Sequence, residues 1–164
     1  MKENLSQSFM AILIGFILFK LIVRFVAVGA LVCGTSMEPT LKDGQKVMSS
    51  IISYYLAEPE RFDVVIIDHP REKYIVKRII GLPGERVRID EDGKVYINDV
   101  CLVEEFISEP IFDSGIASEE ICLGVDEYFV LGDNRNGSTD SRSEIIGNIS
   151  RAWIIAKVIL LKEL

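Results

Sequence analysis

Histidine and cysteine are scarce in this 164-residue chain, and their scarcity excludes several kinds of site. The one histidine, His69, cannot build a histidine-rich metal centre within one chain, and any Ser-His-Asp or Cys-His mechanism would have to use it. The three cysteines, Cys33, Cys101 and Cys122, form no Cys-x-x-Cys motif and lack the spacing of zinc ligands. The sequence therefore predicts no structural metal. Whether Cys101 and Cys122 pair in an oxidising compartment stays open.

Positive charge is also in short supply, since 18 Lys and Arg residues face 25 Asp and Glu residues, a formal net charge of −7. The deficit is uneven: residues 1–35 carry three basic groups and one acidic group, whereas the remaining 129 residues carry 15 basic and 24 acidic groups. An acidic body without a basic stripe predicts no nucleic acid partner. With 49% hydrophobic and 26% charged residues, the composition is that of one globular domain rather than a disordered chain or a polytopic membrane protein.

The one long apolar stretch lies near the amino terminus. No charged residue occurs in residues 9–19, and apolar residues continue past Lys20 and Arg24. A membrane-spanning helix needs about 20 mostly apolar residues, and two basic residues four apart on one helix face can both extend toward lipid headgroups. We interpret residues 1–24 as an uncleaved membrane anchor. A cleaved secretory signal and an amphipathic or buried helix are the alternatives, and basic groups at both ends leave the orientation weakly determined.

The rest of the chain is rich in short strand patterns separated by turns. These patterns, without a long amphipathic helix, predict a mainly β fold over residues 25–164, an antiparallel coiled sheet or sandwich. Residues 91–93 (Glu-Asp-Gly) lie between two such patterns and predict a hairpin. Residues 103–124 show no clear period and are expected to form an irregular loop or insertion. The predicted strands are 25–32, 46–48, 63–68, 74–80, 87–89, 95–97, 127–131 and 153–161.

Ser36 lies where an apolar strand pattern meets a turn, with Gly34 before it and Pro39 after it. Such a junction can hold a nucleophile rigidly at an edge, with backbone N–H groups exposed as oxyanion donors. The alternative for this segment alone is ordinary turn chemistry, because Ser and Thr favour chain reversals.

Lys77 lies between Ile75 and Ile79 on one face of an alternating strand pattern, with Arg78 on the other face. Desolvation between two isoleucines would lower the pKa of a lysine from about 10.4 toward neutrality, and a neutral lysine is a competent general base for a serine. The alternative is an edge-strand lysine that extends into water. Lys73 has the same parity, but it lies at the polar beginning of the strand and is a weaker candidate.

A polar segment, residues 132–142, gathers Asp, Asn, Ser and Arg side chains. It does not fit a calcium loop, because with Asp133 at the first position a cation would stand at the third, where an oxygen ligand is required. The cluster is better suited to fixing other side chains: Ser138 or Asp140 could hold a lysine amine, and Arg142 could neutralise Asp140. The alternative is a solvated turn.

Taken together, the three segments resemble bacterial type I signal peptidases of the short form with a single anchor. That family carries a Ser-Met-x-Pro-Thr motif, a Lys-Arg-x-x-Gly-x-Pro-Gly motif and a Gly-Asp-Asn-Arg…Ser-x-Asp-Ser-Arg motif. Here they stand in the same order at residues 36–40, 77–84 and 132–142. The resemblance extends from the apolar stretch to about residue 147, nearly the whole chain.

The resemblance implies a serine endopeptidase of the cell membrane, single-pass, with its catalytic domain on the extracytoplasmic side. Its partners would be membrane lipid and exported preproteins, cleaved after small residues at −3 and −1, and it would need no metal or other cofactor. The positions that the resemblance assigns are Ser36 as nucleophile, Lys77 as general base, Ser138 as the residue that orients the Lys77 amine, Asp140 and Arg142 as supports of that loop, and Asp133 as the partner of Arg78.

The resemblance also makes the backbone N–H of Ser36 one oxyanion donor. Family members often carry a serine two residues before the nucleophile as a second donor; this chain has Gly34 there, so the second donor stays open. An extended precursor would add a strand to an exposed sheet edge, for which the pattern at residues 25–32 is the candidate. The rival interpretations are a non-catalytic, membrane-anchored β-domain that binds extended peptides and a self-cleaving serine–lysine regulator.

Overall fold

The computed structural model describes residues 10, 12–16, 28–107 and 109–159. Residues 10 and 12–16 are helical, and none of the helices within the described ranges has the length and apolar character that a membrane crossing requires. Most of the predicted anchor, residues 1–24, lies outside the described residues.

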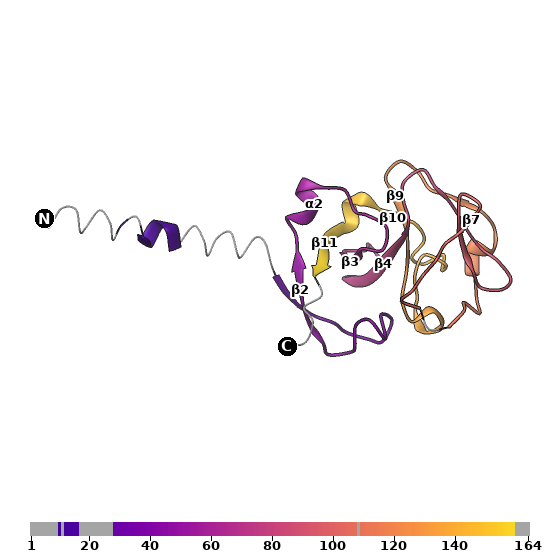
Figure 1. The fold of residues 1–164 in the computed structure, drawn as a ribbon, viewed down its shortest axis with the longest axis horizontal. Helices are drawn as coiled ribbons and strands as arrows, with labels where there is room; N and C mark the ends of the chain where they lie inside the picture. Colours follow the sequence, from indigo (N-terminus) through magenta and orange to yellow (C-terminus); the bar gives the residue numbers. More distant parts are fainter. Residues whose placement is uncertain (1–9, 11, 17–27, 108, 160–164) are drawn as a thin grey trace, which may run out of the picture.

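From residue 28 onward the fold is mainly β, and every strand pairing in the described part of the chain is antiparallel, as predicted (Figure 1). Short helical turns separate some of the strands. The strands are β1 (Val28–Leu31), β2 (Lys46–Ser50), β3 (Val64–Ile67), β4 (Ile75–Gly81), β5 (Arg86–Ile89), β6 (Val95–Ile97), β7 (Val100–Cys101), β8 (Ile121–Cys122), β9 (Glu127–Leu131), β10 (Ile149–Ser150) and β11 (Ile154–Ile159). The helical elements are α2 (Ser53–Leu56), η1 (Gly115–Ser118), η2 (Arg135–Gly137) and η3 (Arg151–Trp153).

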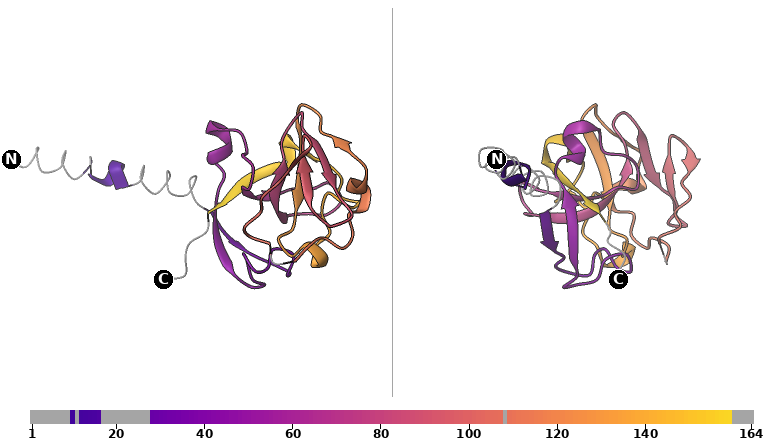
Figure 2. Two further views of the ribbon diagram at one scale, coloured as in Figure 1. Left: turned by 45° about the vertical axis from the view of Figure 1, so that its right-hand side comes forward. Right: turned by 60° about the vertical axis from the view of Figure 1, so that its left-hand side comes forward.

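The strands form two sheets that lie beside one another (Figures 1 and 2). The larger sheet has seven strands in the order β1-β2-β11-β3-β4-β9-β10, and the smaller has four in the order β7-β6-β5-β8. Strand β1 is therefore an edge strand of the larger sheet, whereas β4 and β9 each have a neighbouring strand on both sides. The hairpin predicted at residues 91–93 joins β5 to β6.

Strands β4 and β9 are buried on both faces, which decides the surroundings of the predicted catalytic residues. Along β9, Phe129 and Leu131 pack between the two sheets, whereas Tyr128 and Val130 pack on the opposite face of the larger sheet. Full burial of each large apolar side chain contributes roughly 1.5–3 kcal/mol. Because apolar layers cover both faces, consecutive residues of β4 are buried, including polar ones.

The turn that carries Ser36 is held by a third apolar cluster. Met37 and Leu41 are fully buried in it, and the Leu41 N–H donates to the Met37 carbonyl at 2.9 Å. The cluster also includes Val47 of β2. Apolar anchors therefore fix the backbone on the carboxyl side of Ser36.

The strand patterns at residues 46–48, 63–68, 74–80, 87–89, 95–97 and 127–131 correspond to β2, β3, β4, β5, β6 and β9. The patterns at 25–32 and 153–161 correspond to β1 and β11, and residues 25–27 and 160–161 lie outside the described residues. Sequence patterns missed α2 and the two-residue strands, because so few residues carry no periodic signal. The open question of a disulfide is answered in the negative: Cys101 and Cys122 are free, on β7 and β8 at opposite edges of the smaller sheet.

Candidate active site

Lys77 extends from β4 into a buried environment and contacts the polar segment, residues 132–142. Its amine donates to the Ser138 hydroxyl oxygen at 3.0 Å, and the residue is only 4% exposed. Burial lowers the pKa of Lys77 from its ordinary value of 10.5 to about 8, since removing an ammonium from water disfavours the charged form. Lys73 is exposed at the start of the same segment.

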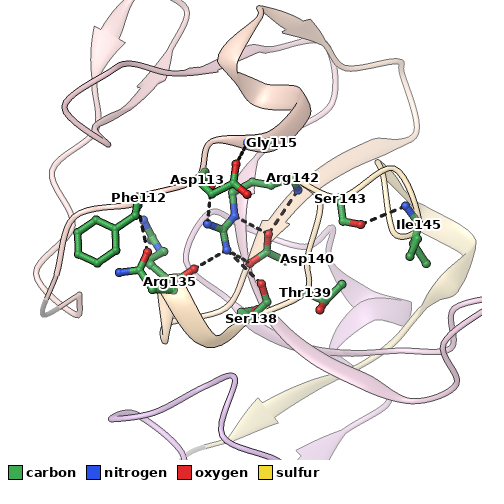
Figure 3. Close-up of a pocket in the computed structure, with 11 residues that line it drawn as sticks. Phe112, Asp113, Gly115, Arg135, Ser138, Thr139, Asp140, Arg142, Ser143 and Ile145 are labelled. Atoms are coloured by element: carbon green, nitrogen blue, oxygen red, sulfur yellow. Dashed lines mark hydrogen bonds and ion pairs between the residues drawn. The ribbon is translucent and has the colours of Figure 1, made fainter.

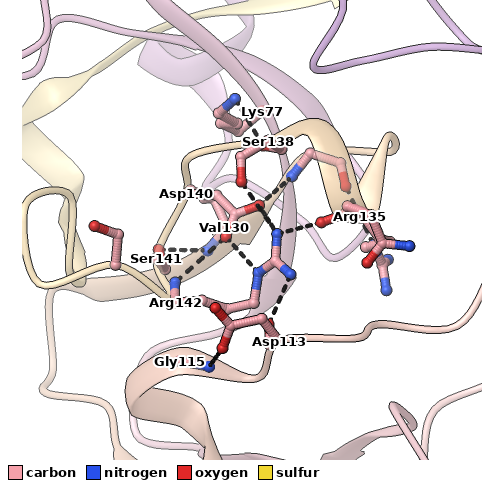
Figure 4. A network of polar contacts seen from close by, with 12 residues as sticks. Lys77, Asp113, Gly115, Val130, Arg135, Ser138, Asp140, Ser141 and Arg142 are labelled. Atoms are coloured by element: carbon pink, nitrogen blue, oxygen red, sulfur yellow. Dashed lines mark hydrogen bonds and ion pairs between the residues drawn. The ribbon is translucent and has the colours of Figure 1, made fainter.

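The charges around Lys77 partly oppose one another, so desolvation dominates its pKa. Asp140 and Asp133 raise that pKa and Arg142 lowers it, each by less than burial does. Asp140 is engaged by Arg142 through two ion-pair contacts, Nε to Oδ1 at 2.8 Å and Nη2 to Oδ2 at 2.9 Å. Figure 4 shows the resulting network, which runs from Lys77 through Ser138 to the Asp140–Arg142 pair.

Arg78, on the opposite face of β4, pairs with Asp133. The Arg78 guanidinium donates to both carboxylate oxygens, Nε to Oδ1 at 2.8 Å and Nη2 to Oδ2 at 2.5 Å. It also stacks on Phe106, 4.0 Å from the ring centroid, and donates to the Thr40 hydroxyl at 3.4 Å. Arg78 thus ties β4 to the carboxyl end of the Ser36 segment.

Ser36 is half-buried, and its backbone is joined to the segment that carries Ser138. The Asn134 N–H donates to the Ser36 carbonyl at 3.1 Å, and the Asn134 side-chain amide donates to the Thr35 carbonyl at 3.2 Å. Within the described residues, no hydrogen bond joins the Ser36 hydroxyl to the Lys77 amine. Catalytic hydrogen bonds are often long in enzymes without bound substrate, so this geometry does not exclude the pair.

Gly132 lies at the closest approach of these segments. A side-chain Cβ at this position would overlap the Ser138 hydroxyl and would lie 2.5 Å from the Ser36 carbonyl oxygen. The Gly132 N–H also donates to Asp140 at 3.0 Å. Only glycine therefore lets the backbone at residue 132 lie this close to both the Ser138 side chain and the Ser36 carbonyl.

The turn before Ser36 leaves backbone donors available. Gly34, at φ +91°, donates its N–H to Asp43 at 2.7 Å, so that N–H is already engaged. In the described part of the chain, the N–H groups of Thr35 and Ser36 have no hydrogen-bond partner, and the Ser36 N–H can donate to an oxyanion.

His69, the only histidine, has another role. It is 3% exposed, packs edge-on against Trp153, and its Nδ1 accepts from the N–H groups of Arg71 and Glu72. These contacts make His69 part of a structural turn. Among the described residues, no cluster of acidic, cysteine or histidine side chains could hold a metal ion.

A pocket of about 570 Å³ is lined largely by residues of the polar segment (Figure 3). Its wall includes Ser138, Asp140 and Arg142 but neither Ser36 nor Lys77, so it is distinct from the space in front of the serine. Sequence patterns missed Glu104, Phe106 and Asp113, because the segment that carries them shows no period. Asn134 and Arg135 lie in the polar segment that the sequence singled out, but the sequence assigned no role to them.

Comparison with known proteins identifies the class of protein to which this fold and this group of residues belong. Residues 5–161 match the family described as signal peptidase, peptidase S26. A probable signal peptidase I-2 of Synechocystis is 37% identical, over 85% of this chain and 69% of the relative. A signal peptidase I of Bacillus licheniformis is also 37% identical, over 87% of this chain and 80% of the relative.

A solved structure agrees with these relatives. The crystal structure of a signal peptidase I from Enterococcus faecalis matches with a TM-score of 0.51 and 32% identity, covering 62% of this chain and 97% of that chain. The chain belongs to the signal peptidase family, peptidase S26. It is therefore a peptidase that removes signal peptides from preproteins. These matches favour the catalytic interpretation over the non-catalytic β-domain.

Proposed function

We propose that the protein is a serine endopeptidase of the signal peptidase I type in which Ser36 is the nucleophile and Lys77 the general base. The observation that carries this assignment is the buried Lys77 amine on the Ser138 hydroxyl, 3.0 Å away, with a pKa lowered to about 8. A serine is a weak nucleophile until a neighbouring base takes its proton. At pH 8 about half of the Lys77 side chains are neutral and able to act as that base.

In the acylation step, the Ser36 oxygen attacks the scissile carbonyl carbon while its proton passes to the Lys77 amine. The tetrahedral intermediate carries its negative charge on the former carbonyl oxygen, which the free Ser36 N–H stabilises. Collapse breaks the C–N bond, and the Lys77 ammonium gives its proton to the leaving amine. Ser138 orients the Lys77 amine through both steps.

In the deacylation step, Lys77 is neutral again and takes a proton from the water that attacks the ester carbonyl carbon. Collapse of the second tetrahedral intermediate breaks the bond to the Ser36 oxygen, which takes the proton back from Lys77 and releases the product as a carboxylic acid. The Asp140–Arg142 pair holds the segment that carries Ser138. Asp133 and Arg78 hold the segment against β4 from the opposite face. The acid–base chemistry is thus carried out by protein groups alone.

The precursor binds as an extended strand beside β1, an edge strand whose residues are mostly exposed. In an extended peptide, side chains at −1 and −3 point to the same side, so one apolar surface selects small residues at both. Residues 1–24 anchor the enzyme in the cell membrane with the catalytic domain outside the cytoplasm, which raises the effective concentration of membrane-bound precursor. Exported preproteins and membrane lipid are then its partners.

Cleavage of a precursor with an Ala-x-Ala site by the full chain in detergent tests the assignment. We expect wild type to cut after the second alanine, and Ser36→Ala and Lys77→Met to lose at least about 10³-fold in kcat/KM while remaining folded. Matched controls are Ser118→Ala and Lys46→Met, which change an exposed serine and an exposed lysine. Equal cleavage by Ser36→Ala would refute the assignment.

A further inference from the structure

A buried ion pair joins residues 132–142, here named the catalytic loop, to the segment between β7 and β8. The Glu104 carboxylate accepts from both terminal nitrogens of Arg135, Nη1 at 2.9 Å and Nη2 at 2.5 Å. The Glu104 and Arg135 side chains are 4% and 1% exposed. Both charges are therefore almost completely removed from water, far from the aqueous surroundings of an ordinary surface pair.

Such a pair contributes little to net stability but much to geometry. Desolvation of two charges offsets most of their attraction, so a buried ion pair can often be replaced by apolar side chains without loss of stability. Two parallel hydrogen bonds between a planar guanidinium and a carboxylate nevertheless fix the relative orientation of both. The value of the Glu104–Arg135 pair therefore lies in where it holds Arg135.

Arg135 in turn holds the residue at the closest approach of the site. Its Nε donates to the Gly132 carbonyl at 3.2 Å, and its own carbonyl accepts from Arg142 Nη2 at 2.6 Å. Gly132 packs directly against the Ser138 hydroxyl and the Ser36 carbonyl. A displacement of Arg135 would thus be transmitted to both Ser36 and the residue that orients Lys77.

Further hydrogen bonds also hold the same two segments together. We name residues 104–107 and 109–116 the brace segment. Beyond the ion pair, its backbone meets the catalytic loop through Phe112 N–H to Asn136 Oδ1 at 3.0 Å, Arg142 Nη1 to the Asp113 carbonyl at 3.0 Å, and Ile116 N–H to the Arg142 carbonyl at 2.9 Å. None of these three contacts involves the Glu104 side chain, so the contribution of that side chain can be tested separately.

We propose that Glu104 is a positioning residue for peptide cleavage, and this inference rests on the proposed function. By binding both terminal nitrogens of Arg135, Glu104 directs the Nε–H of that guanidinium at the Gly132 carbonyl. The position of Gly132 in turn sets where Ser36 and Ser138 lie relative to Lys77. Glu104 touches none of the reacting atoms. It changes the rate of the chemical step and leaves precursor binding unchanged.

Steady-state cleavage of the Ala-x-Ala precursor by the full chain in detergent tests this role. We expect Glu104→Gln to lower kcat about 10- to 100-fold with KM within about twofold of wild type, since small displacements of reacting groups cost rate rather than binding. The double variant Glu104→Met/Arg135→Met removes both charges, keeps apolar volume and avoids an unpaired buried charge. It is expected to resist urea at least as well as wild type and still to show the lowered kcat. Asp99→Asn, which breaks the exposed Arg86–Asp99 pair, is the control with unchanged kcat.

The possible outcomes separate this inference from the proposed function. A kcat near wild type in Glu104→Gln, or its recovery in the stable double variant, would show that the pair only supports folding and would overturn the inference. A rise in KM at constant kcat would also overturn it, because the pair would then act on binding. If wild type and Asp99→Asn both fail to cleave, the proposed function is wrong and the inference falls with it.

Discussion

Replacement of Lys77 by methionine should stabilise the fold at neutral pH and lose that advantage in alkali. The pKa of Lys77 is about 8 in the folded protein and near 10.5 when the residue is exposed, a difference of about 2.5. Each pKa unit corresponds to about 1.4 kcal/mol, so burial of the protonated amine costs about 3 kcal/mol below pH 8. This cost is the energetic consequence of keeping the proposed general base inside the protein.

The sign of the effect follows from proton binding. Between pH 8 and 10.5 the unfolded chain holds a proton on Lys77 that the folded chain has released, so wild-type stability rises with pH across this window. Lys77→Met has no such group. Its advantage over wild type should therefore be about 3 kcal/mol larger at pH 7 than at pH 10.5, whatever constant amount the lost Ser138 hydrogen bond subtracts at both.

Urea unfolding of the full chain in detergent, for wild type and Lys77→Met at several pH values from 7 to 10.5, measures this difference. Because every other titratable group is present in both proteins, the comparison isolates Lys77. Lys46→Met, which changes an exposed lysine of β2, should show a constant difference from wild type across the same range. A difference between wild type and Lys77→Met that stays constant within about 1 kcal/mol would refute the claim that burial controls the Lys77 pKa.

Two further predictions concern activity. The value of kcat/KM should rise with pH and reach half of its maximum near pH 8, because only the neutral Lys77 amine accepts the Ser36 proton. Initial rates over a pH series measure this midpoint. A midpoint below about pH 7 or above about pH 9.5 would contradict the prediction. Gly132→Ala should lower kcat at least about 100-fold, because the new Cβ would displace Ser138 and the Ser36 carbonyl. Gly124→Ala is the control, since its Cβ would meet only the flexible Glu127 side chain at 3.3 Å, and it should keep most of the activity in the same assay. Equal rates for the two variants would refute the packing argument.

The sequence was informative where local periodicity and local chemistry agree. Strand β9 was predicted with its observed bounds, because four apolar or aromatic residues in a row follow Glu127 and lie between turn-forming segments. The pairing of Lys77 with Ser138 was expected, and the two side chains meet at 3.0 Å although 61 positions separate them. That expectation came from the order and spacing of three motifs, since the periodicity of β4 alone favoured a solvated lysine.

The sequence did not predict the two-residue strands or the single contacts between irregular segments. Strands β7 and β8 are too short to show any period, and their places at opposite edges of one sheet keep Cys101 and Cys122 apart. Glu104 carries no local signal, since a glutamate in an aperiodic segment is usually a solvated charge. Only the packing of that segment on the catalytic loop buries it against Arg135.

The sequence by itself predicted the fold class, the position of most strands and the candidate groups for the chemistry, because alternation and residue type are local properties. The tertiary structure decided which of these groups are desolvated and which are in contact. Lys77 has a lowered pKa because β4 lies inside a sheet that is covered on both faces. The Ser36 carbonyl and the Ser138 side chain both lie against residue 132 because that residue is a glycine. Burial and close approach depend on residues far apart in the chain, and so they are fixed only when the chain has folded.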